Sequence, residues 1–441
     1  MGDDPMEWDT GAAAWMLMSA SLVLLMTPGL AFFYGGMVRA KSVLNMMMMS
    51  FGAMGVIGVI YVLWGWSMSY GPTIGGFLGN PFDQFGLSGT LTDADGNAVA
   101  STLGNYPQVI DVAFQVTFAI ITTALISGAI ADRVKFSSWM TFVPLWVTLS
   151  YFPMAHMVWG GGFLSSSEDG LAAMVFGVVD GAAAVAPVDF AGGTVVHINA
   201  GVAGLVLALL VGKRKGFGKE PMRPHNLPFV MLGAALLWFG WFGFNAGSAF
   251  GANEGAGLAW VNTTSATAAA ILGWLVVEKI RDGHATSLGA ASGIVAGLVA
   301  ITPAAGVLNP VTSIILGVVA GALCALAVGL KYRFGFDDSL DVVGVHLVGG
   351  LVGTVGIGFL AGEGGLFFGD GVKLLVVQVL IALVAILVSA VMTGLIGLAI
   401  KKTIGWRVSE EAEVGGIDLA EHGEAAYETI GSGRVITEGK A

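Results

Sequence analysis

Long apolar stretches dominate this sequence, and they restrict its fold more than any other feature. Eleven of them approach or exceed the roughly 20 residues that an α-helix needs to cross the hydrocarbon core of a bilayer. A soluble domain carries about 25% charged residues, whereas this chain of 441 residues carries 11%. We therefore predict an all-α polytopic membrane protein with eleven transmembrane helices. The stretches run approximately over 12–37, 44–70, 109–131, 137–157, 191–212, 227–250, 256–278, 285–303, 310–331, 342–362 and 371–400.

The basic residues predict the orientation of these helices. Given eleven spans, 18 of the 19 lysines and arginines fall on one side of the membrane, and only Lys373 falls on the other. Loops rich in lysine and arginine remain in the cytoplasm. The N-terminus should then lie outside and the C-terminus inside. We expect a transmembrane domain over 1–401 and a polar cytoplasmic tail over 402–441, with no separate soluble domain.

Several classes of function find no support in the sequence. The single cysteine, Cys324, excludes a disulfide framework and a multi-cysteine metal site. No metal-ligand spacing, nucleotide-binding loop or nucleophile elbow is present. The start, MGDDPMEWD, lacks the positive region of a secretory signal, so we expect the first helix to be retained. We predict no enzymatic activity, no cofactor and no nucleic-acid partner.

Two histidines interrupt the apolar stretches at mirrored depths. His197 follows Asp189 by eight residues in the fifth stretch, and His346 follows Asp341 by five in the tenth. At 1.5 Å per residue each lies about 8–12 Å inside its helix, from opposite faces of the membrane. Spans five and ten fit an inverted five-helix repeat. Each histidine alone could be an interhelical hydrogen-bond donor, and we expect both aspartates to cap their helices.

The segments around these histidines resemble the ammonium transporter family (Amt/Mep/Rh). The fragment DFAGGTVVHINAG starts at residue 189, and MTPGLAFFYGGMVRAKSVLN, FQVTFAIITTALISGAIADR, WFGFNAGSA and DVVGVHLVGG also resemble family segments in the same order. The resemblance covers residues 10 to 427, including the tail. Small departures occur at ADR (131–133) and VGGID (414–418). The resemblance implies an eleven-helix fold, a homotrimer and one pore within each subunit.

Carried over by position, the resemblance implies a set of site residues. In this sequence the outer ammonium-recruitment site falls on Trp159, Phe118 and Ser248, with Asp189 beside it. The phenyl gate falls on Phe118 and Phe244. The pore histidines fall on His197 and His346, and the tryptophan flanking the pore falls on Trp241. Trp159 favours an Amt-type over a Rh-type member. From the residues alone, ordinary bundle packing of Phe118, Phe244 and Trp241 remains an open alternative.

Physical chemistry indicates how such residues would act on ammonium. A bare cation in a low-dielectric core costs on the order of 20 kcal/mol, so a narrow apolar pore excludes it. Aromatic faces bind a desolvated cation by about 2 kcal/mol. A hydroxyl such as that of Ser248 accepts an N–H, which sodium and potassium cannot offer. Ammonia, once a proton is removed, suits apolar walls, and His197 and His346 could relay the proton.

The resemblance also implies partners and a location. We expect ammonium or ammonia as substrate, methylammonium as an analogue, a homotrimer in the lipid bilayer of the plasma membrane, and a part in nitrogen uptake. A PII-type signalling protein is a candidate partner at the cytoplasmic face. From its residues alone the acidic tail is interpreted as a solvated arm, whereas family members dock it under the trimer. Rival hypotheses are an ammonium sensor and a channel for another small neutral solute.

Overall fold

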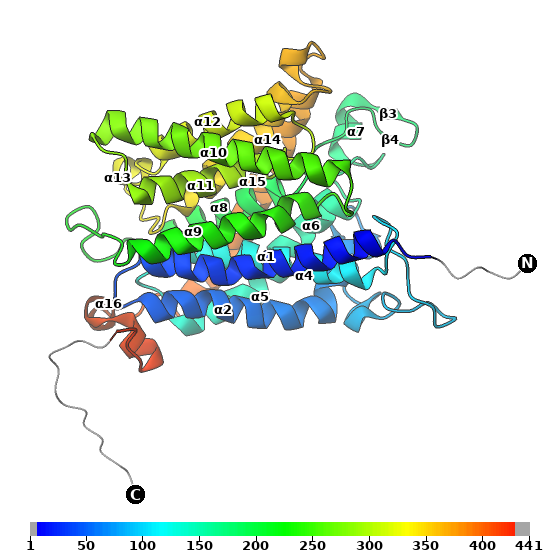
Figure 1. The fold of residues 1–441 in the computed structure, drawn as a ribbon. Coiled ribbons are helices and arrows are strands. Elements are labelled where there is room, and N and C mark those ends of the chain that lie inside the picture. The colour runs from blue at the N-terminus through cyan, green and yellow to red at the C-terminus, as the bar shows by residue number, and fades with distance from the viewer. Residues whose placement is uncertain (1–6, 428–441) are drawn as a thin grey trace, which may run out of the picture.

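The computed structural model describes residues 7–427, and long helices running side by side make up most of it (Figure 1). Within these residues nine helices are long and apolar enough to cross a membrane. The predicted multi-pass helical character is therefore confirmed. Two further predicted stretches, 137–157 and 285–303, are also helical, as α5 to α6 and as α11. The strands in the described chain form two short hairpins in the loops.

The first half of the chain supplies five helical segments, several of which contain a π-helical turn. These are α1 (Thr10–Met37), α2 (Val43–Ile60) with η1 (Tyr61–Gly65) and α3 (Trp66–Tyr70), α4 (Val109–Ile126) with η3 (Ser127–Ile130), α5 (Phe136–Trp146) with η4 (Val147–Tyr151) and α6 (Phe152–Trp159), and η5 (Gly193–Ile198) with α8 (Asn199–Val211). The loops between them hold β1 (Thr73–Ile74), β2 (Leu78–Gly79), η2 (Phe85–Leu87), α7 (Leu171–Phe176), β3 (Val178–Val179) and β4 (Ala182–Ala183).

The second half supplies six helical segments and the tail. These are α9 (Leu227–Trp241) with η6 (Phe242–Ala246), α10 (Glu254–Asp282), α11 (Ser287–Ile301), α12 (Pro310–Ala327) with α13 (Leu330–Phe334), η7 (Val343–Leu347) with α14 (Val348–Leu360), and α15 (Lys373–Lys402). A 3₁₀ turn, η8 (Leu366–Phe368), precedes α15, and α16 (Glu410–Gly415) and η9 (Asp418–His422) follow it. Helix α1 lies beside α9 and α4, and α10 lies beside α12 and α11 (Figure 1).

Glycines let these helices approach one another closely, as the composition predicts. A Cβ atom added at Gly317 or Gly321 of α12 would lie 2.2 or 2.1 Å from the carbonyl oxygen of Ala266 or Ala270 in α10. Added at Gly353 of α14, it would lie 2.1 Å from a backbone oxygen of α11. Close backbone contact of this kind is what small residues provide in lipid, where no hydrophobic force drives helices together.

The tail packs against the membrane domain over residues 402–427, so its interpretation as a solvated arm is wrong for this part. Trp406 and Ile417 are buried. The carboxylate of Asp418 accepts hydrogen bonds from the backbone N–H groups of Leu44 and Asn45, at 3.1 and 2.8 Å, at the start of α2. Unsatisfied N–H groups at a helix start favour a carboxylate, which the residue pattern of the tail alone does not reveal. Residues 428–441 of the predicted tail lie outside the described residues.

The α10–α12 contact makes a prediction about two Gly→Ala substitutions. Gly321→Ala would force a Cβ against the Ala270 carbonyl, and overpacking of this kind costs about 1–3 kcal/mol. Gly257→Ala, at an exposed position of α10 with open space around it, should instead be neutral or stabilise by about 1 kcal/mol. Thermal unfolding of the two purified variants in detergent measures this difference. Equal midpoints would contradict the packing described.

Candidate functional site

The two intramembrane histidines meet inside the bundle. His197 lies in η5 and His346 in η7, and their Nδ1 atoms are 3.2 Å apart. The rings are nearly parallel, at 18°, and the side chains are buried, with the residues 1% and 3% exposed. A hydrogen bond between two Nδ1 atoms requires one protonated and one unprotonated nitrogen. One ring therefore donates its Nδ1 proton to the Nδ1 atom of the other. The sequence predicts only that each histidine lies deep in its helix, and the structure adds that the two rings are in contact.

Reciprocal glycine contacts bring the histidines together. Gly201 and Gly350 each follow a histidine by four residues. A Cβ on Gly201 would lie 2.5 Å from the Leu347 nitrogen, beside His346, and a Cβ on Gly350 would lie 3.1 Å from the His197 Cβ. The helix that carries His197 thus places Gly201 against the turn around His346, and the helix that carries His346 places Gly350 against the turn around His197. The HxxxG spacing in HINAG and HLVGG is visible in the sequence, but spacing alone does not show that two helices cross at these glycines.

Aspartates fix the start of each histidine segment, though not both of the predicted ones. Asp189 accepts hydrogen bonds from the N–H groups of Gly192, Gly193 and Thr194, at 2.9, 2.5 and 2.9 Å, so its predicted capping role is confirmed. The prediction for Asp341 is wrong. Its carboxylate binds the Lys331 ammonium at 2.7 Å instead of the helix start.

Asp338 caps the second segment in place of Asp341. Its carboxylate accepts the N–H groups of Val342 and Val343, at 3.0 and 2.7 Å. The N–H groups of Val342 and Val343 directly follow Asp341 in the chain, and Asp338 reaches them from four and five residues earlier. Asp338 precedes its histidine by eight residues, as Asp189 does. Burial raises the pKa of both Asp189 and Asp338, the latter to about 6, although hydrogen bonds to the helix N–H groups act against this shift.

A continuous series of aromatic contacts leads from the end of α6 to the histidine pair. Trp159 meets the edge of Phe118 with ring centroids 6.0 Å apart, and Phe118 stacks on Phe244 at 4.1 Å and 21°. Phe244 contacts Trp241 at 5.3 Å, and Trp241 stacks on His197 at 5.5 Å and 13°. These rings form one series although they come from separate elements, namely α4, α6, η5, α9 and η6. The positions of the motifs in the sequence could not show these contacts.

The polar groups near the α6 end are oriented by the backbone. The Ser248 hydroxyl donates to the Phe244 carbonyl at 2.8 Å, so its lone pairs remain available to accept a hydrogen bond. The indole N–H of Trp159 donates to the carbonyl oxygen of Asp189 at 2.9 Å. Thr302 accepts from the indole of Trp241 at 2.8 Å, and no sequence signal marked it. His156 is buried elsewhere, against Ser69 and Thr73.

Narrow cavities lie on both sides of the His346 ring. One extends from Phe244 past His197 to His346 and is lined otherwise by apolar side chains, including Ile121 and Val295. The other continues from His346 to Asp341 and includes Tyr34. The walls of the first exclude a hydrated cation but suit a small neutral molecule. In the lining of the first cavity, the two imidazoles are the groups that can exchange a proton.

The model of a known protein family, described as Ammonium Transporter Family, matches residues 14–427. The chain belongs to the ammonium transporter family. Members of this family are transporters and channels for ammonium rather than enzymes, which confirms the prediction of no enzymatic activity.

Individual relatives agree with the family match. An ammonium transporter of Mycobacterium bovis is 54% identical, with 97% of this chain and 92% of the relative covered. Among solved structures, Candida albicans Mep2 superposes with a TM-score of 0.82 at 32% identity, covering 95% of this chain and 90% of that one. A structure named Sensor Amt Protein also reaches 0.82, at 28% identity, with 94% and 98% covered.

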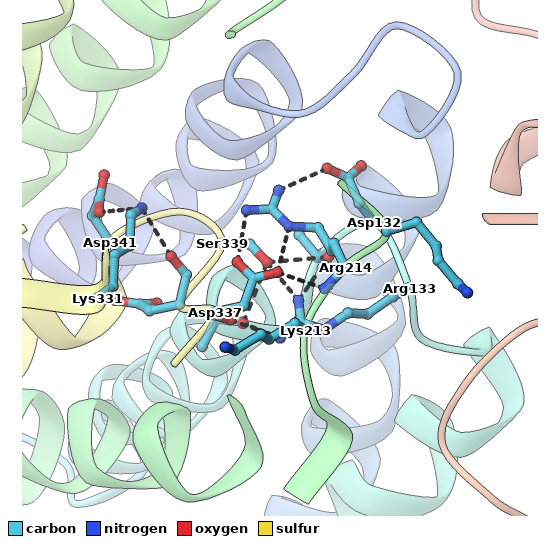
Figure 2. Close-up of polar contacts among 12 residues, drawn as sticks. Asp132, Arg133, Lys213, Arg214, Lys331, Asp337, Ser339 and Asp341 are labelled. Carbon is cyan, nitrogen blue, oxygen red and sulfur yellow. Dashed lines mark hydrogen bonds and ion pairs between the residues drawn. The ribbon is translucent and has the colours of Figure 1, made fainter. Parts of the chain in front are cut away.

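A buried cluster of charged residues lies at the end of the helix bundle where η7 begins (Figure 2). Arg214 binds the Asp337 carboxylate through Nε and Nη2, at 2.9 and 2.8 Å, and reaches Asp132 at 3.1 Å. Arg133 donates to the Asp337 carbonyl and the Ser339 hydroxyl. Burial lowers the pKa of Arg133 to about 10, and although burial alone would raise the pKa of Asp337, the Arg214 guanidinium keeps it below its ordinary value. The sequence showed these residues only as markers of topology.

The cap at Asp189 makes a prediction about stability. Asp189→Ala leaves buried N–H groups without an acceptor, which costs about 1–3 kcal/mol. Asp189→Asn keeps one acceptor oxygen and should lose clearly less. Thermal unfolding in detergent compares the two variants with the parent chain. Equal losses would mean that the charge, rather than the cap, stabilises this segment.

Proposed function

We propose that this protein is an ammonium transporter that recruits ammonium at an aromatic site, removes a proton and conducts ammonia past the twin histidines, with the proton relayed separately. One observation carries the proposal: two buried imidazoles share a hydrogen bond on a path that is otherwise apolar. Neither a purely structural histidine pair nor a pore for hydrated ions would need this combination.

Recruitment is assigned to Trp159, Phe118 and Ser248. The indole and the phenyl ring offer π faces to a partly dehydrated cation. Because the Ser248 hydrogen is engaged by the Phe244 carbonyl, the hydroxyl oxygen can accept an N–H of ammonium. Asp189 orients Trp159 through its carbonyl, and its half-buried carboxylate lies at the start of the same segment. Potassium carries no hydrogen to donate, so the hydroxyl favours ammonium over an ion of similar size.

The stacked rings of Phe118 and Phe244 are assigned to a gate. At a centroid distance of 4.1 Å they leave no room for a molecule between them, so both must rotate for passage. Beyond them the walls offer few polar partners, and a cation entering there would lose its hydration without replacement. Deprotonation before or at the gate removes this penalty. Ammonia, which is neutral, then crosses an apolar segment in which any cation would lose its hydration.

The relay is assigned to His197 and His346. With one proton between two Nδ1 atoms, a proton arriving on one ring allows another to leave from its partner. Double protonation is disfavoured, because two like charges in an apolar site repel and lose hydration. Trp241 stacks on His197, and its indole N–H is held by the Thr302 hydroxyl. This contact fixes the orientation of the His197 ring.

The same proposal includes eleven spans, an inverted five-helix repeat, the N-terminus outside and the C-terminus inside. Matched spacing supports the repeat: Asp189, His197 and Gly201 in one half have counterparts in Asp338, His346 and Gly350, with reciprocal contacts. The basic residues support the orientation, because Arg133 and Arg214 then lie with the tail on the cytoplasmic side.

Assembly and location complete the proposal. The family resemblance supports a homotrimer with a pore in each subunit, in the plasma membrane, serving nitrogen uptake. Residues 1–401 form the transport domain and 402–441 the regulatory tail, whose described part packs near the proposed cytoplasmic ends of α2 and α5. A PII-type signalling protein is the proposed partner at that face, and methylammonium the proposed analogue of the substrate.

Current recorded from proteoliposomes on a solid support during an ammonium pulse tests the function. We expect a transient inward current for the parent chain. In His346→Ala the amplitude of this current should fall by tenfold or more. His156→Ala is the matched control, because His156 is buried away from the path, and its current should persist. Internal alkalinisation without current in the parent chain would indicate passive ammonia conduction.

A sensor is the second candidate, because one of the similar structures is named Sensor Amt Protein. A sensor would bind ammonium at the aromatic site without appreciable flux. Saturable methylammonium binding, with neither current nor pH change in the same proteoliposomes, would favour this candidate and contradict transport.

The recruitment site makes a separate prediction about the apparent affinity for ammonium. Trp159→Leu and Ser248→Ala should each raise the half-saturating ammonium concentration about fivefold to thirtyfold, since one cation–π contact or one hydrogen bond is worth about 1–2 kcal/mol. Trp260→Leu, at an exposed tryptophan stacked on Phe242, is the matched control and should change little. Half-saturation unchanged in both site variants would exclude this recruitment site.

A further inference from the structure

The stretch between β4 and η5, which carries Asp189, runs between two cavities. Residues 186–189 form neither helix nor strand. Val188 lines a cavity of about 650 Å³, whereas its neighbours Pro187 and Asp189 line another of about 560 Å³. This alternation is that of an extended backbone, whose successive side chains point to opposite sides. Because open space lies on both sides, packing alone does not fix this stretch, and its hydrogen bonds determine where Asp189 lies.

Gln378 of α15 binds both main-chain groups of Val188. Its Oε1 accepts the Val188 N–H at 2.9 Å, and its Nε2 donates to the Val188 carbonyl at 2.8 Å. The second N–H of the same Nε2 donates to the Thr354 carbonyl in α14 at 3.0 Å. The side chain is buried, and its amide thus uses both donors and its acceptor. It takes the place that a neighbouring strand would have and ties the stretch to two helices.

Asp189, the next residue, orients Trp159. Its carbonyl accepts the indole N–H of Trp159 at 2.9 Å, while its carboxylate caps η5. Trp159 also lines the second cavity, so the indole is not enclosed on that side. The hydrogen bond to Asp189 and the edge contact with Phe118 therefore set the direction of the ring.

The peptide plane that holds the Asp189 carbonyl is anchored from two directions. The N–H in this plane belongs to Phe190 and donates to the Pro303 carbonyl at 3.1 Å. The plane before it contains the Val188 carbonyl, which Gln378 holds. Without Gln378 the Asp189 carbonyl keeps only one of these anchors, so its position becomes less defined and the indole loses a fixed acceptor.

We propose that Gln378 is a positioning residue of the recruitment site, which holds Val188 so that the Asp189 carbonyl keeps the Trp159 indole in place for ammonium. The proposal rests on the proposed function for its substrate. Gln378 lines neither of the cavities beside the histidines. It therefore acts on capture of the ion and not on its passage. Loss of Gln378 should weaken the apparent affinity for ammonium and leave the maximal current near that of the parent chain.

Nuclear magnetic resonance of fluorine in the fluorotryptophan-labelled protein tests the positioning itself. The signal that is missing in Trp159→Leu belongs to Trp159. We expect this signal to shift or broaden in Gln378→Met, whose side chain has a similar length but no amide. Thr393→Val is the matched control, because Thr393 is also buried in α15 but accepts the Trp146 indole N–H, about 22 Å further along the helix. In this control the Trp159 signal should stay in place.

Ammonium-dependent current in proteoliposomes tests the consequence for transport. Gln378→Met should raise the half-saturating ammonium concentration about threefold to tenfold, as expected for loss of one hydrogen bond, with the maximal current changed by less than about twofold. Thr393→Val should leave half-saturation unchanged. In a chain that already carries Trp159→Leu, Gln378→Met should raise half-saturation no further, because the indole through which Gln378 acts is gone.

The two measurements separate this inference from the function on which it rests. A Trp159 signal in Gln378→Met that coincides with that of the parent chain overturns the inference, whatever the currents. A signal that moves, while Trp159→Leu leaves half-saturation unchanged, supports the positioning contact and contradicts the recruitment site instead.

The currents can also overturn the inference on their own. A lower maximal current at unchanged half-saturation would show that Gln378 supports the bundle rather than the site. Effects of Gln378→Met and Trp159→Leu that multiply in the double variant would contradict action through Trp159. Folding is checked by thermal unfolding in detergent. If Gln378→Met does not fold, Gln378→Asn replaces it, since its amide is one methylene too short to reach both Val188 groups, and the same results decide.

Discussion

The contact between His197 and His346 is the interaction on which the rest of this structure depends. Two imidazoles in the apolar centre of a helix bundle are stable as a pair because each satisfies a nitrogen of the other. A single ring there would leave its polar atoms without partners, at a cost of about 1–3 kcal/mol each. The contact requires two helices to cross with their backbones nearly touching. Gly201 and Gly350 make that crossing possible, and Asp189 and Asp338 fix where each histidine segment begins.

The path on either side follows from the same constraint. The rings from Trp159 to Trp241 pack in series against His197, so the approach to the histidines is aromatic. On the other side, the chain after α13 must turn sharply to begin η7, and the charged cluster around Arg214 and Asp337 holds that turn. An apolar centre disfavours a bare cation, because the ion would lose its hydration there. For this reason the proposed function places the selective step at the outer end of the path, where aromatic faces and the Ser248 hydroxyl are found.

The sequence predicted much of the fold and part of the site. Apolar stretches of about 20 residues predicted the helices, and the mirrored positions of His197 and His346 predicted that each lies deep in its helix. The residues alone could not show that Phe118 stacks on Phe244, since aromatic residues in a bundle are ordinarily packing groups. They also predicted Asp341 as the cap, whereas the N–H groups at the start of this segment are bound by Asp338, four and five residues earlier in the chain. The docking of the tail depends on open helix starts elsewhere in the chain, which are invisible in its own composition.

Nuclear magnetic resonance of the protein labelled with ¹⁵N-histidine tests the central claim most directly. A hydrogen bond between two Nδ1 atoms transmits a coupling between their nitrogen nuclei. The account predicts such a coupling between His197 and His346, with one protonated Nδ1 in the pair, and its disappearance in His346→Ala. Two rings without mutual coupling, each hydrogen-bonded elsewhere or to water, would contradict the shared-proton pair and the relay built on it.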